Sequence, residues 1–230
     1  MASWLNYNSD AGVTPKKAAA VILLEQDTGS VLLVQRNKAL AFMGGHHAFP
    51  GGSVAEQDTG RCVQGTNDTD LAVAITTAVR ELYEETGVLL TEGKMPNAKQ
   101  RAAARLEVLD HPEKFEPFLE ANGLHIEADK FIPIGRWITP TFAPMRFDTQ
   151  YFLYCTDTLL PATPIGQDGE ITATSWLNAG ESLNQRAKGQ IQMSTPVVFV
   201  LRRLTILPLD KAIERLQHTP GFSDIIHDYI

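Results

Sequence analysis

Cysteine is scarce in this sequence: Cys62 and Cys155 are two residues among 230. They lie far apart, and neither has a partner at the spacing of a metal site. A disulfide framework is therefore not expected, and a reducing compartment is the default. We interpret both as small core residues rather than nucleophiles. A chain of this length with 43% hydrophobic residues can instead form one substantial core, so residues 1–230 are predicted to be a single domain.

Long hydrophobic runs and an excess of positive charge are also missing. No apolar segment approaches a membrane span, the first residues lack the regions of a secretory signal, and the final HDYI matches no retention or peroxisomal signal. We expect a soluble cytoplasmic protein. Lys and Arg number 20 against 27 Asp and Glu, and a net charge of −7 disfavours binding to nucleic acid or an anionic membrane. An acidic protein can still bind phosphates if it binds cations first.

Two apolar runs open the chain. Residues 18–36 read as two strands joined by a short Asp-Thr-Gly turn, which predicts a β-hairpin. A third strand is predicted in residues 46–52, HHAFPGG, closed by Pro50 and the glycine pair. Residues 53–68 that follow are polar, contain glycine and show no apolar period. They are predicted to form a surface loop.

The next segment has the start, stop and spacing of a helix. Asp68 or Thr69 can cap its N-terminus, and Gly87 supplies a left-handed C-terminal position. Apolar residues recur between them at helical spacing. The predicted helix is of ordinary length, roughly sixteen residues.

Three carboxylates, Glu81, Glu84 and Glu85, crowd the last turns of this helix, beside its apolar stripe. Like charges at these spacings destabilise a helix, and acids at its C-terminus oppose the macrodipole. Arg80 can pair with Glu84, but one cation cannot neutralise three acids. A solvated acidic face is the simpler interpretation of a Glu-rich helix. A bound Mg²⁺ or Mn²⁺ accounts better for the border position and the wrong end of the dipole.

The stretch RELYEETGV, residues 80–88, resembles the second half of the Nudix box, R-E-U-x-E-E-x-G-U with U apolar, at every defined position. The first half is not intact, because Thr66 and Ala72 stand where the box has its glycine and first glutamate. The simplest account is an insertion inside the box. Without that glutamate, Arg80 can pair with Asp68, with Asp70, or with Glu84 alone.

Such an insertion is similar to that of the peroxisomal-type coenzyme A diphosphatases and their bacterial relatives, and similar segments extend over most of the chain. The resemblance implies an α/β/α sandwich with a mixed sheet. Residues 95–125 are predicted to form a helical insertion, with two helices in 98–122 that act either as a lid or as a packing appendage. Strands are expected in 131–140 and 146–155, and two C-terminal helices after Pro196.

The resemblance also implies a metal-dependent hydrolase. Glu84 and Glu85 are then the principal metal ligands, and Glu81 is a further or water-mediated ligand. The backbone of Gly51 and Gly52 can approach the metal and the substrate phosphates because it carries no side chain. Arg80 belongs to the catalytic set.

The general base is implied in a loop before a late strand, where Glu170 lies. Asp168 competes for this role, and a box glutamate is a third choice. Arg36 and Arg146 are candidate phosphate ligands, although both can equally be surface arginines.

The coenzyme A signature is only partly kept. Leu32, Leu33, Arg36, Gly45 and residues 49–52 preserve its frame, while Asn37 and Ala41 replace its Ser and second Arg. Coenzyme A or an acyl-coenzyme A is the first substrate expectation. ADP-ribose, NADH or a nucleotide sugar is the alternative, and a non-catalytic nucleotide sensor is a remote third. The partner is a small molecule, and the protein is expected to be a monomer or homodimer.

Overall fold

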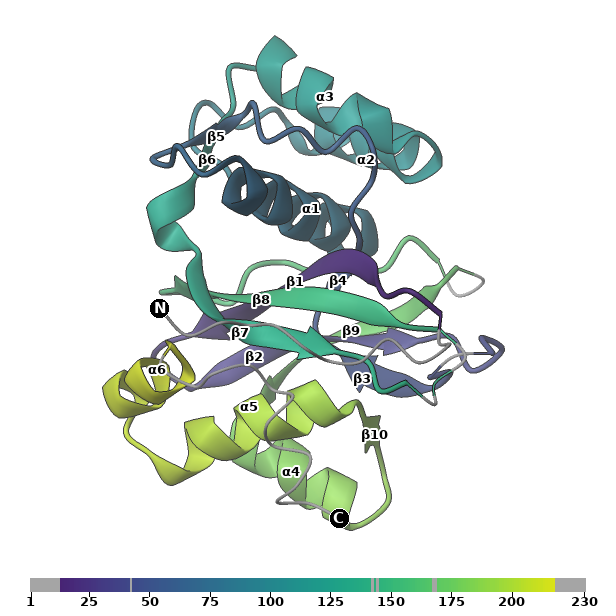
Figure 1. Ribbon diagram of the computed structural model, residues 1–230, viewed down its shortest axis with the longest axis vertical. Coiled ribbons are helices and arrows are strands. Elements are labelled where there is room, and N and C mark those ends of the chain that lie inside the picture. Colours follow the sequence, from purple (N-terminus) through teal and green to yellow (C-terminus); the bar gives the residue numbers. More distant parts are fainter. Residues whose placement is uncertain (1–12, 42, 142, 144, 167–168, 218–230) are drawn as a thin grey trace.

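The computed structural model, which describes residues 13–41, 43–141, 143, 145–166 and 169–217, has a mixed sheet between two layers of helices (Figure 1). Eight strands form the main sheet among these residues: β1 Lys16–Glu25, β2 Ser30–Arg36, β3 His46–Ala48, β4 Gly51–Ser53, β7 Ile132–Ile138, β8 Phe147–Thr156, β9 Ile171–Asn178 and β10 Gln192–Met193. The expected α/β/α sandwich is confirmed.

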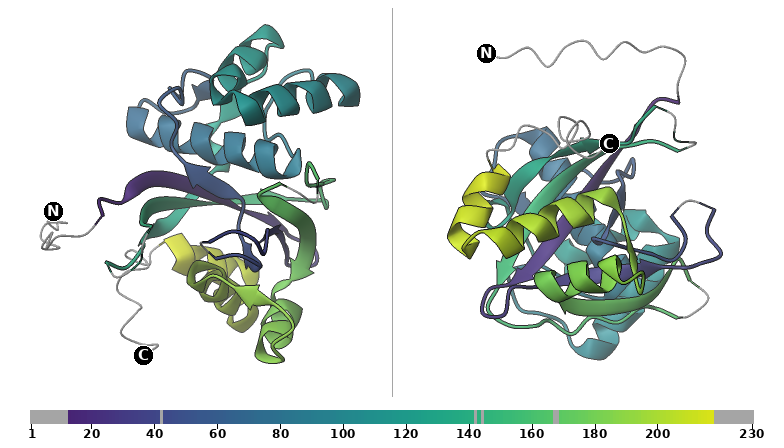
Figure 2. Two further views of the ribbon diagram at one scale, coloured as in Figure 1. Left: turned by 90° about the vertical axis from the view of Figure 1, so that its right-hand side faces the viewer. Right: turned by 90° about the horizontal axis from the view of Figure 1, so that it is seen from below.

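Helices cover both faces of the sheet, as the edge-on view in Figure 2 shows. One layer contains α1 Thr69–Thr86, α2 Ala98–Asp110 and α3 Phe115–Ala121, together with the small parallel pair β5 Val63–Gln64 and β6 Ile126–Glu127. The other layer contains α4 Ala179–Ala187, α5 Thr195–Ile206 and α6 Leu209–Gln217. A short 3₁₀ helix, Pro112–Lys114, connects α2 to α3, and a second, Ala128–Lys130, connects β6 to β7 of the main sheet.

Strand β1 lies at the centre of the sheet, and both of its faces are buried. Val21 and Leu23 pack toward the α1 layer, and Ile22 and Leu24 pack toward the α5 layer. It runs parallel to β8 over its whole length and antiparallel to β2 at one end and β4 at the other. A strand buried on both faces reads as a continuous apolar run rather than as an alternating one, which explains the sequence of residues 18–24.

The predicted hairpin is confirmed, but the predicted third strand is wrong in detail. Residues 46–52 form parts of two short strands: β3 pairs with β2, while β4 pairs with β1. Pro50 lies between them, has no N–H for a ladder, and offers its carbonyl oxygen to the Val21 nitrogen at 3.0 Å. The glycine pair therefore begins a strand instead of closing one.

The polar segment 53–68 also differs from the prediction. Its C-terminal part forms β5, and both Asp58 and Cys62 are buried rather than at the surface. Burial raises the pKa of the Cys62 thiol to about 11, which agrees with a core residue and not a nucleophile. The two helices predicted in residues 98–122 are present, with their break after Asp110, and the predicted C-terminal helices correspond to α5 and α6.

Candidate active site

Helix α1 begins and ends where its capping residues require. The side chain of Asp68 accepts a hydrogen bond from the Leu71 nitrogen at 3.0 Å, which satisfies one free N–H of the first turn. Gly87 ends the helix at φ 75°, and its N–H donates to the carbonyl of Tyr83. Ile75 and Leu82 bury the apolar stripe in the core. The three acids of the last turns are consequently fixed at the border between core and surface.

Two glycines of β4 face these acids. The N–H of Gly51 donates to Oε2 of Glu85 at 3.1 Å. A Cβ added to Gly52 would stand 2.5 Å from the carboxyl carbon of Glu81, so only glycine leaves room for that side chain. The backbone of Gly51 and Gly52 therefore lies against the carboxylates of Glu85 and Glu81.

Arg80 is fully buried and contacts three acids, Glu81, Glu84 and Asp58, which together with Glu85 we call the acidic cluster. Its Nη1 donates to Glu81 and to Glu84, both at 2.9 Å. Its Nε and Nη2 donate to the two carboxylate oxygens of Asp58 at 2.8 and 2.9 Å, and Nη2 also donates to the Ser53 carbonyl. Burial opposes its charge, but the hydrogen bond and charge of Asp58 and the charges of both glutamates outweigh it and raise the pKa of Arg80.

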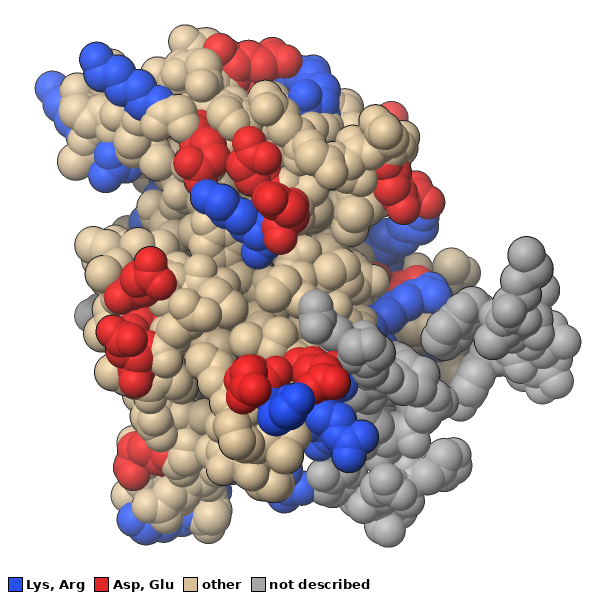
Figure 3. All heavy atoms as spheres, turned by 90° about the vertical axis from the view of Figure 1, so that its left-hand side faces the viewer, with Lys and Arg blue, Asp and Glu red and all other residues tan. Residues whose placement is uncertain are grey.

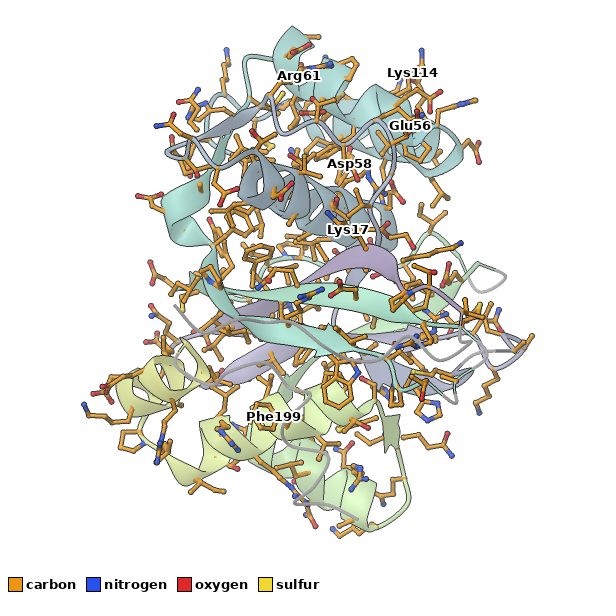
Figure 4. All side chains as sticks on the ribbon, in the orientation of Figure 1. Lys17, Glu56, Asp58, Arg61, Lys114 and Phe199 are labelled. Atoms are coloured by element: carbon orange, nitrogen blue, oxygen red, sulfur yellow. The ribbon has the colours of Figure 1, made fainter. Side chains whose placement is uncertain are left out.

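Sequence reasoning assigned the second partner of Arg80 incorrectly. Asp68 caps α1 and Asp70 lies exposed in its first turn, so neither is the partner. Asp58, in the inserted segment, takes that position (Figure 4). No local signal could have identified it, because it lies 22 residues before Arg80 in a polar stretch with no apolar period.

The pKa values of all three box carboxyls are raised, and burial is the first cause in each case. The charge of Glu81 adds to the effect on its neighbours, so the pKa of Glu84 rises to about 7 and that of Glu85 lies well above its ordinary range. The charge and hydrogen bonds of Arg80 offset only part of the rise in the pKa values of Glu81 and Glu84. The site thus holds more negative charge than the described side chains neutralise.

This donor set fits a hard divalent cation by its chemistry. Clustered carboxylate oxygens are the ligands that Mg²⁺ and Mn²⁺ prefer, and an added positive charge would relieve their mutual repulsion. In the described part of the chain, no three His, Cys, Asp or Glu side chains already form a metal-binding group. Glu84 is turned to Arg80 and Glu85 to Gly51. The residues that could hold an ion are Glu81, Glu84 and Glu85, after their side chains rotate.

Glu170 and Arg36 form an ion pair at the edge of this cluster. Nη1 of Arg36 lies 2.8 Å from Oε1 of Glu170, whose side chain is 61% exposed. Glu170 contributes to the raised pKa of Glu81 and Glu85, and Arg36 opposes it at Glu85, so both lie near the box acids. Glu170 directly precedes β9, as expected for a loop leading into a late strand. Its competitor, Asp168, lies outside the described residues.

The structure does not bring Arg146 to the cluster. Its Nε donates to the Thr139 carbonyl at 2.9 Å and its Nη1 to the Val13 carbonyl at 3.0 Å, which holds the guanidinium against the backbone before β8. Arg105, which the sequence did not single out, does reach the site. Its Nε and Nη2 both donate to the carbonyl of Glu84, where α1 leaves carbonyls without partners.

One face of the molecule carries charged side chains of both signs. Figure 3 shows a face on which the described acidic and basic side chains are interspersed rather than gathered into one basic patch. No described helix is long and apolar enough to cross a membrane.

Comparisons with known proteins agree with this fold. A family model described as "NUDT19 Nudix domain" matches residues 63–204. The curated protein "Putative nudix hydrolase 7" of Caenorhabditis elegans is 30% identical over 193 residues, which is 83% of this chain and 60% of that protein. The crystal structure of a NUDIX hydrolase from Alicyclobacillus acidocaldarius superposes with a TM-score of 0.78 at 27% identity, and the match covers 92% of this chain and 99% of that one. The chain thus spans 60% of the length of the curated relative it matches.

Proposed function

The chain belongs to the Nudix hydrolase superfamily, and we propose that it is a metal-dependent hydrolase that cleaves the diphosphate bond of a nucleoside diphosphate linked to another moiety. The observation that carries this proposal is the packing of Glu81 and Glu85 against the glycine strand β4, with Glu84 joined to Glu81 through Arg80. Their pKa values are raised first by burial, and the charges of Arg80 and Arg36 offset this rise only in part. A cation site lined by backbone suits a substrate that brings its own negative charge.

The proposed cofactor is Mg²⁺ or Mn²⁺, held by Glu84 and Glu85, with Glu81 as a further or water-mediated ligand. When bound, such an ion supplies positive charge for the diphosphate oxygens and lowers the pKa of water. Arg80 keeps Glu81 and Glu84 in place through Nη1. The absence of side chains at Gly51 and Gly52 leaves room for the phosphates.

Proton transfer is assigned to Glu170. Its carboxylate lies near the box acids and is largely exposed, so it can accept a proton from the attacking water and return it to solvent. Arg36, its ion-pair partner, is the proposed phosphate ligand, because an arginine fork matches phosphate oxygens. One of the box glutamates is the alternative base. Arg146 remains a candidate ligand only if substrate draws it from its backbone partners.

The proposed substrate is coenzyme A or an acyl-coenzyme A. The support is the signature frame itself: its apolar pair and Arg36 lie on β2, and its final glycines form β4 beside Glu81 and Glu85. Asn37 and Ala41, in place of the usual Ser and second Arg, make ADP-ribose, NADH or a nucleotide sugar the alternative. A nucleotide sensor without catalysis is the remote third candidate. We place the enzyme in the cytoplasm, as a monomer or homodimer.

A substrate panel tests the proposal. The purified protein is incubated with Mg²⁺ or Mn²⁺ and with coenzyme A, acetyl-coenzyme A, ADP-ribose, NADH or a nucleotide sugar. The products are identified by mass spectrometry. Glu84→Gln and Glu85→Gln serve as controls. Cleavage of coenzyme A into a phosphopantetheine and an adenosine bisphosphate, lost in both variants, supports the first substrate. Cleavage of another diphosphate alone supports the alternative. Nucleotide binding without any cleavage would overturn the hydrolase proposal in favour of a sensor.

A further inference from the structure

The inserted segment packs on the side of α1 that carries Ala72, the position at which the family pattern has a glutamate. Gly60 of this segment has φ 78°, and a Cβ added to it would stand 2.6 Å from the Cβ of Ala72. The close contact depends on two small residues, one on each side. The segment therefore occupies the side of the helix on which a longer residue 72 would stand.

Asp58 of the same segment supplies a carboxylate to Arg80. It accepts two hydrogen bonds from the guanidinium, at 2.8 and 2.9 Å, in the bidentate geometry that fixes both position and orientation. The hydroxyl of Thr77 and the N–H of Ala55 also donate to its Oδ2, at 2.8 and 2.9 Å. With its Nε and Nη2 held in this way, Arg80 has Nη1 aimed at Glu81 and Glu84.

Helix α3 holds the segment in turn. Oε2 of Glu116 accepts from the N–H and the hydroxyl of Thr59, at 2.9 and 2.8 Å, and its Oε1 accepts from the Cys62 N–H at 3.4 Å. Glu116 is buried, so water cannot replace its carboxylate as the acceptor for these N–H groups. At the surface, Arg61 and Glu120 add an ion pair of 2.7 Å between the same two elements. Helix α3 therefore anchors the inserted segment.

We propose that Asp58 is a positioning residue for hydrolysis, which orients Glu81 and Glu84 through Arg80, and that Glu116 of α3 keeps Asp58 in register. This inference rests on the proposed function, because it assigns the two carboxylates a role in catalysis. The two insertions in the chain then form one support for the acidic cluster. The family model that matches this chain begins at residue 63, after both Asp58 and the glycine strand.

The first test compares Asp58→Asn with Asp68→Ala. Both remove an aspartate of the same segment, but Asp68 only caps α1 and contacts none of the box acids. Asp58→Asn is expected to lower kcat about 10- to 100-fold, as loss of an outer partner of a metal site typically does, with little change in KM. Asp68→Ala is expected to lower the thermal midpoint and leave kcat unchanged. Wild-type kcat in Asp58→Asn, or a change confined to KM, overturns the proposal.

The second test compares Glu116→Gln with Glu120→Gln, the same chemical change at two positions of one helix. Glu116→Gln is expected to lower kcat and to speed amide hydrogen exchange in residues 55–62, because one buried acceptor is replaced by a donor. Glu120→Gln breaks only a surface pair and is expected to do neither. This pair of variants also decides the question if Asp58→Asn does not fold: a wild-type kcat and exchange rate in Glu116→Gln overturns the proposal.

The wild-type protein separates the two levels of inference. If it cleaves no diphosphate with either metal, the proposed function fails and the positioning role fails with it. If it cleaves a diphosphate while Asp58→Asn and Glu116→Gln both keep the wild-type kcat, only the positioning role is overturned.

Discussion

The backbone nitrogen of Gly51 lies 3.1 Å from Oε2 of Glu85, so a hydrogen bond joins the glycine strand to the last turn of α1. These residues belong to two separate motifs, 34 positions apart. The hydrogen bond lowers the pKa of Glu85, but burial and the charge of Glu81 outweigh it. The contact brings the backbone of β4 to the carboxylates that we propose as metal ligands.

Replacement of Gly52 by alanine should impair the site while leaving the fold intact. The new Cβ would stand 2.5 Å from the carboxyl carbon of Glu81, and this side chain can rotate away because only its flexible end is displaced. Misplacement of a catalytic group by about 1 Å can cost about 100-fold in rate, so a fall in kcat of that order is expected. Gly166→Ala is the matched control, since an added Cβ there meets nothing within 4 Å. Equal kcat values for the two variants would contradict the role assigned to Glu81.

The stability of the metal-free protein should depend on pH through Glu84. Burial raises the pKa of this carboxyl from 4.5 to about 7, so the folded state binds its proton more tightly than the unfolded state does. Stability from this group is therefore present below pH 4.5 and is lost as pH rises to about 7. Glutamine at position 84 does not ionise, so Glu84→Gln lacks this loss of stability at high pH. The free energy of unfolding of the variant, relative to wild type, should increase by about 1 to 3 kcal/mol from pH 5 to pH 8.

Urea unfolding in the presence of a chelator measures this change. The difference in unfolding free energy between Glu84→Gln and wild type is compared at the two pH values. A difference that stays the same at both would show that Glu84 titrates normally in the folded protein.

Local sequence signals were sufficient for the elements that carry the acids. The capping residues Asp68 and Gly87 predicted the ends of α1, and the apolar run of residues 18–24 predicted the strand that became β1. Helix α4 was missed, because only Ala179 and Ser182 of its nine residues are buried and no apolar stripe marks it.

Tertiary contacts were beyond the same reasoning. The glycine pair was taken as the end of a strand, because its partner in the ladder is β1 rather than the preceding strand β2. Asp58 was taken as part of a surface loop, because its burial depends on Arg80 and Thr77 in α1. Both assignments depend on pairing between distant segments, for which periodicity and local propensity carry no information.

Arg105 should stabilise the C-terminal end of α1. Its two hydrogen bonds to the Glu84 carbonyl, at 3.1 and 3.0 Å, satisfy an acceptor that the helix leaves free. Arg105→Ala is expected to lower the free energy of unfolding by about 1 to 3 kcal/mol in urea titrations. Lys99→Ala, at an exposed position of α2, the helix that carries Arg105, should change the free energy of unfolding by less than about 0.5 kcal/mol. Equal unfolding midpoints for the two variants would rule out the capping role.

Substitution of Glu170 tests the general base. If Glu170 accepts the proton from water, Glu170→Gln should lower kcat by about 10² to 10⁴ and flatten the acid limb of the pH–rate profile. Glu181→Gln, at an exposed acid in the first turn of α4, is the control. An unchanged kcat and profile in Glu170→Gln would move the role to a box glutamate.

The most direct test of the proposed metal site is to measure the binding of Mn²⁺ to the isolated protein. Titration calorimetry at pH 7.5 makes this measurement and needs no substrate. Wild type should bind at least one Mn²⁺ with release of protons, because the pKa of Glu84 is raised to about 7 and this group is partly protonated without metal. Glu85→Gln should bind Mn²⁺ much more weakly. No binding to wild type, or equal binding to the two proteins, would contradict the claim that these carboxylates form the metal site.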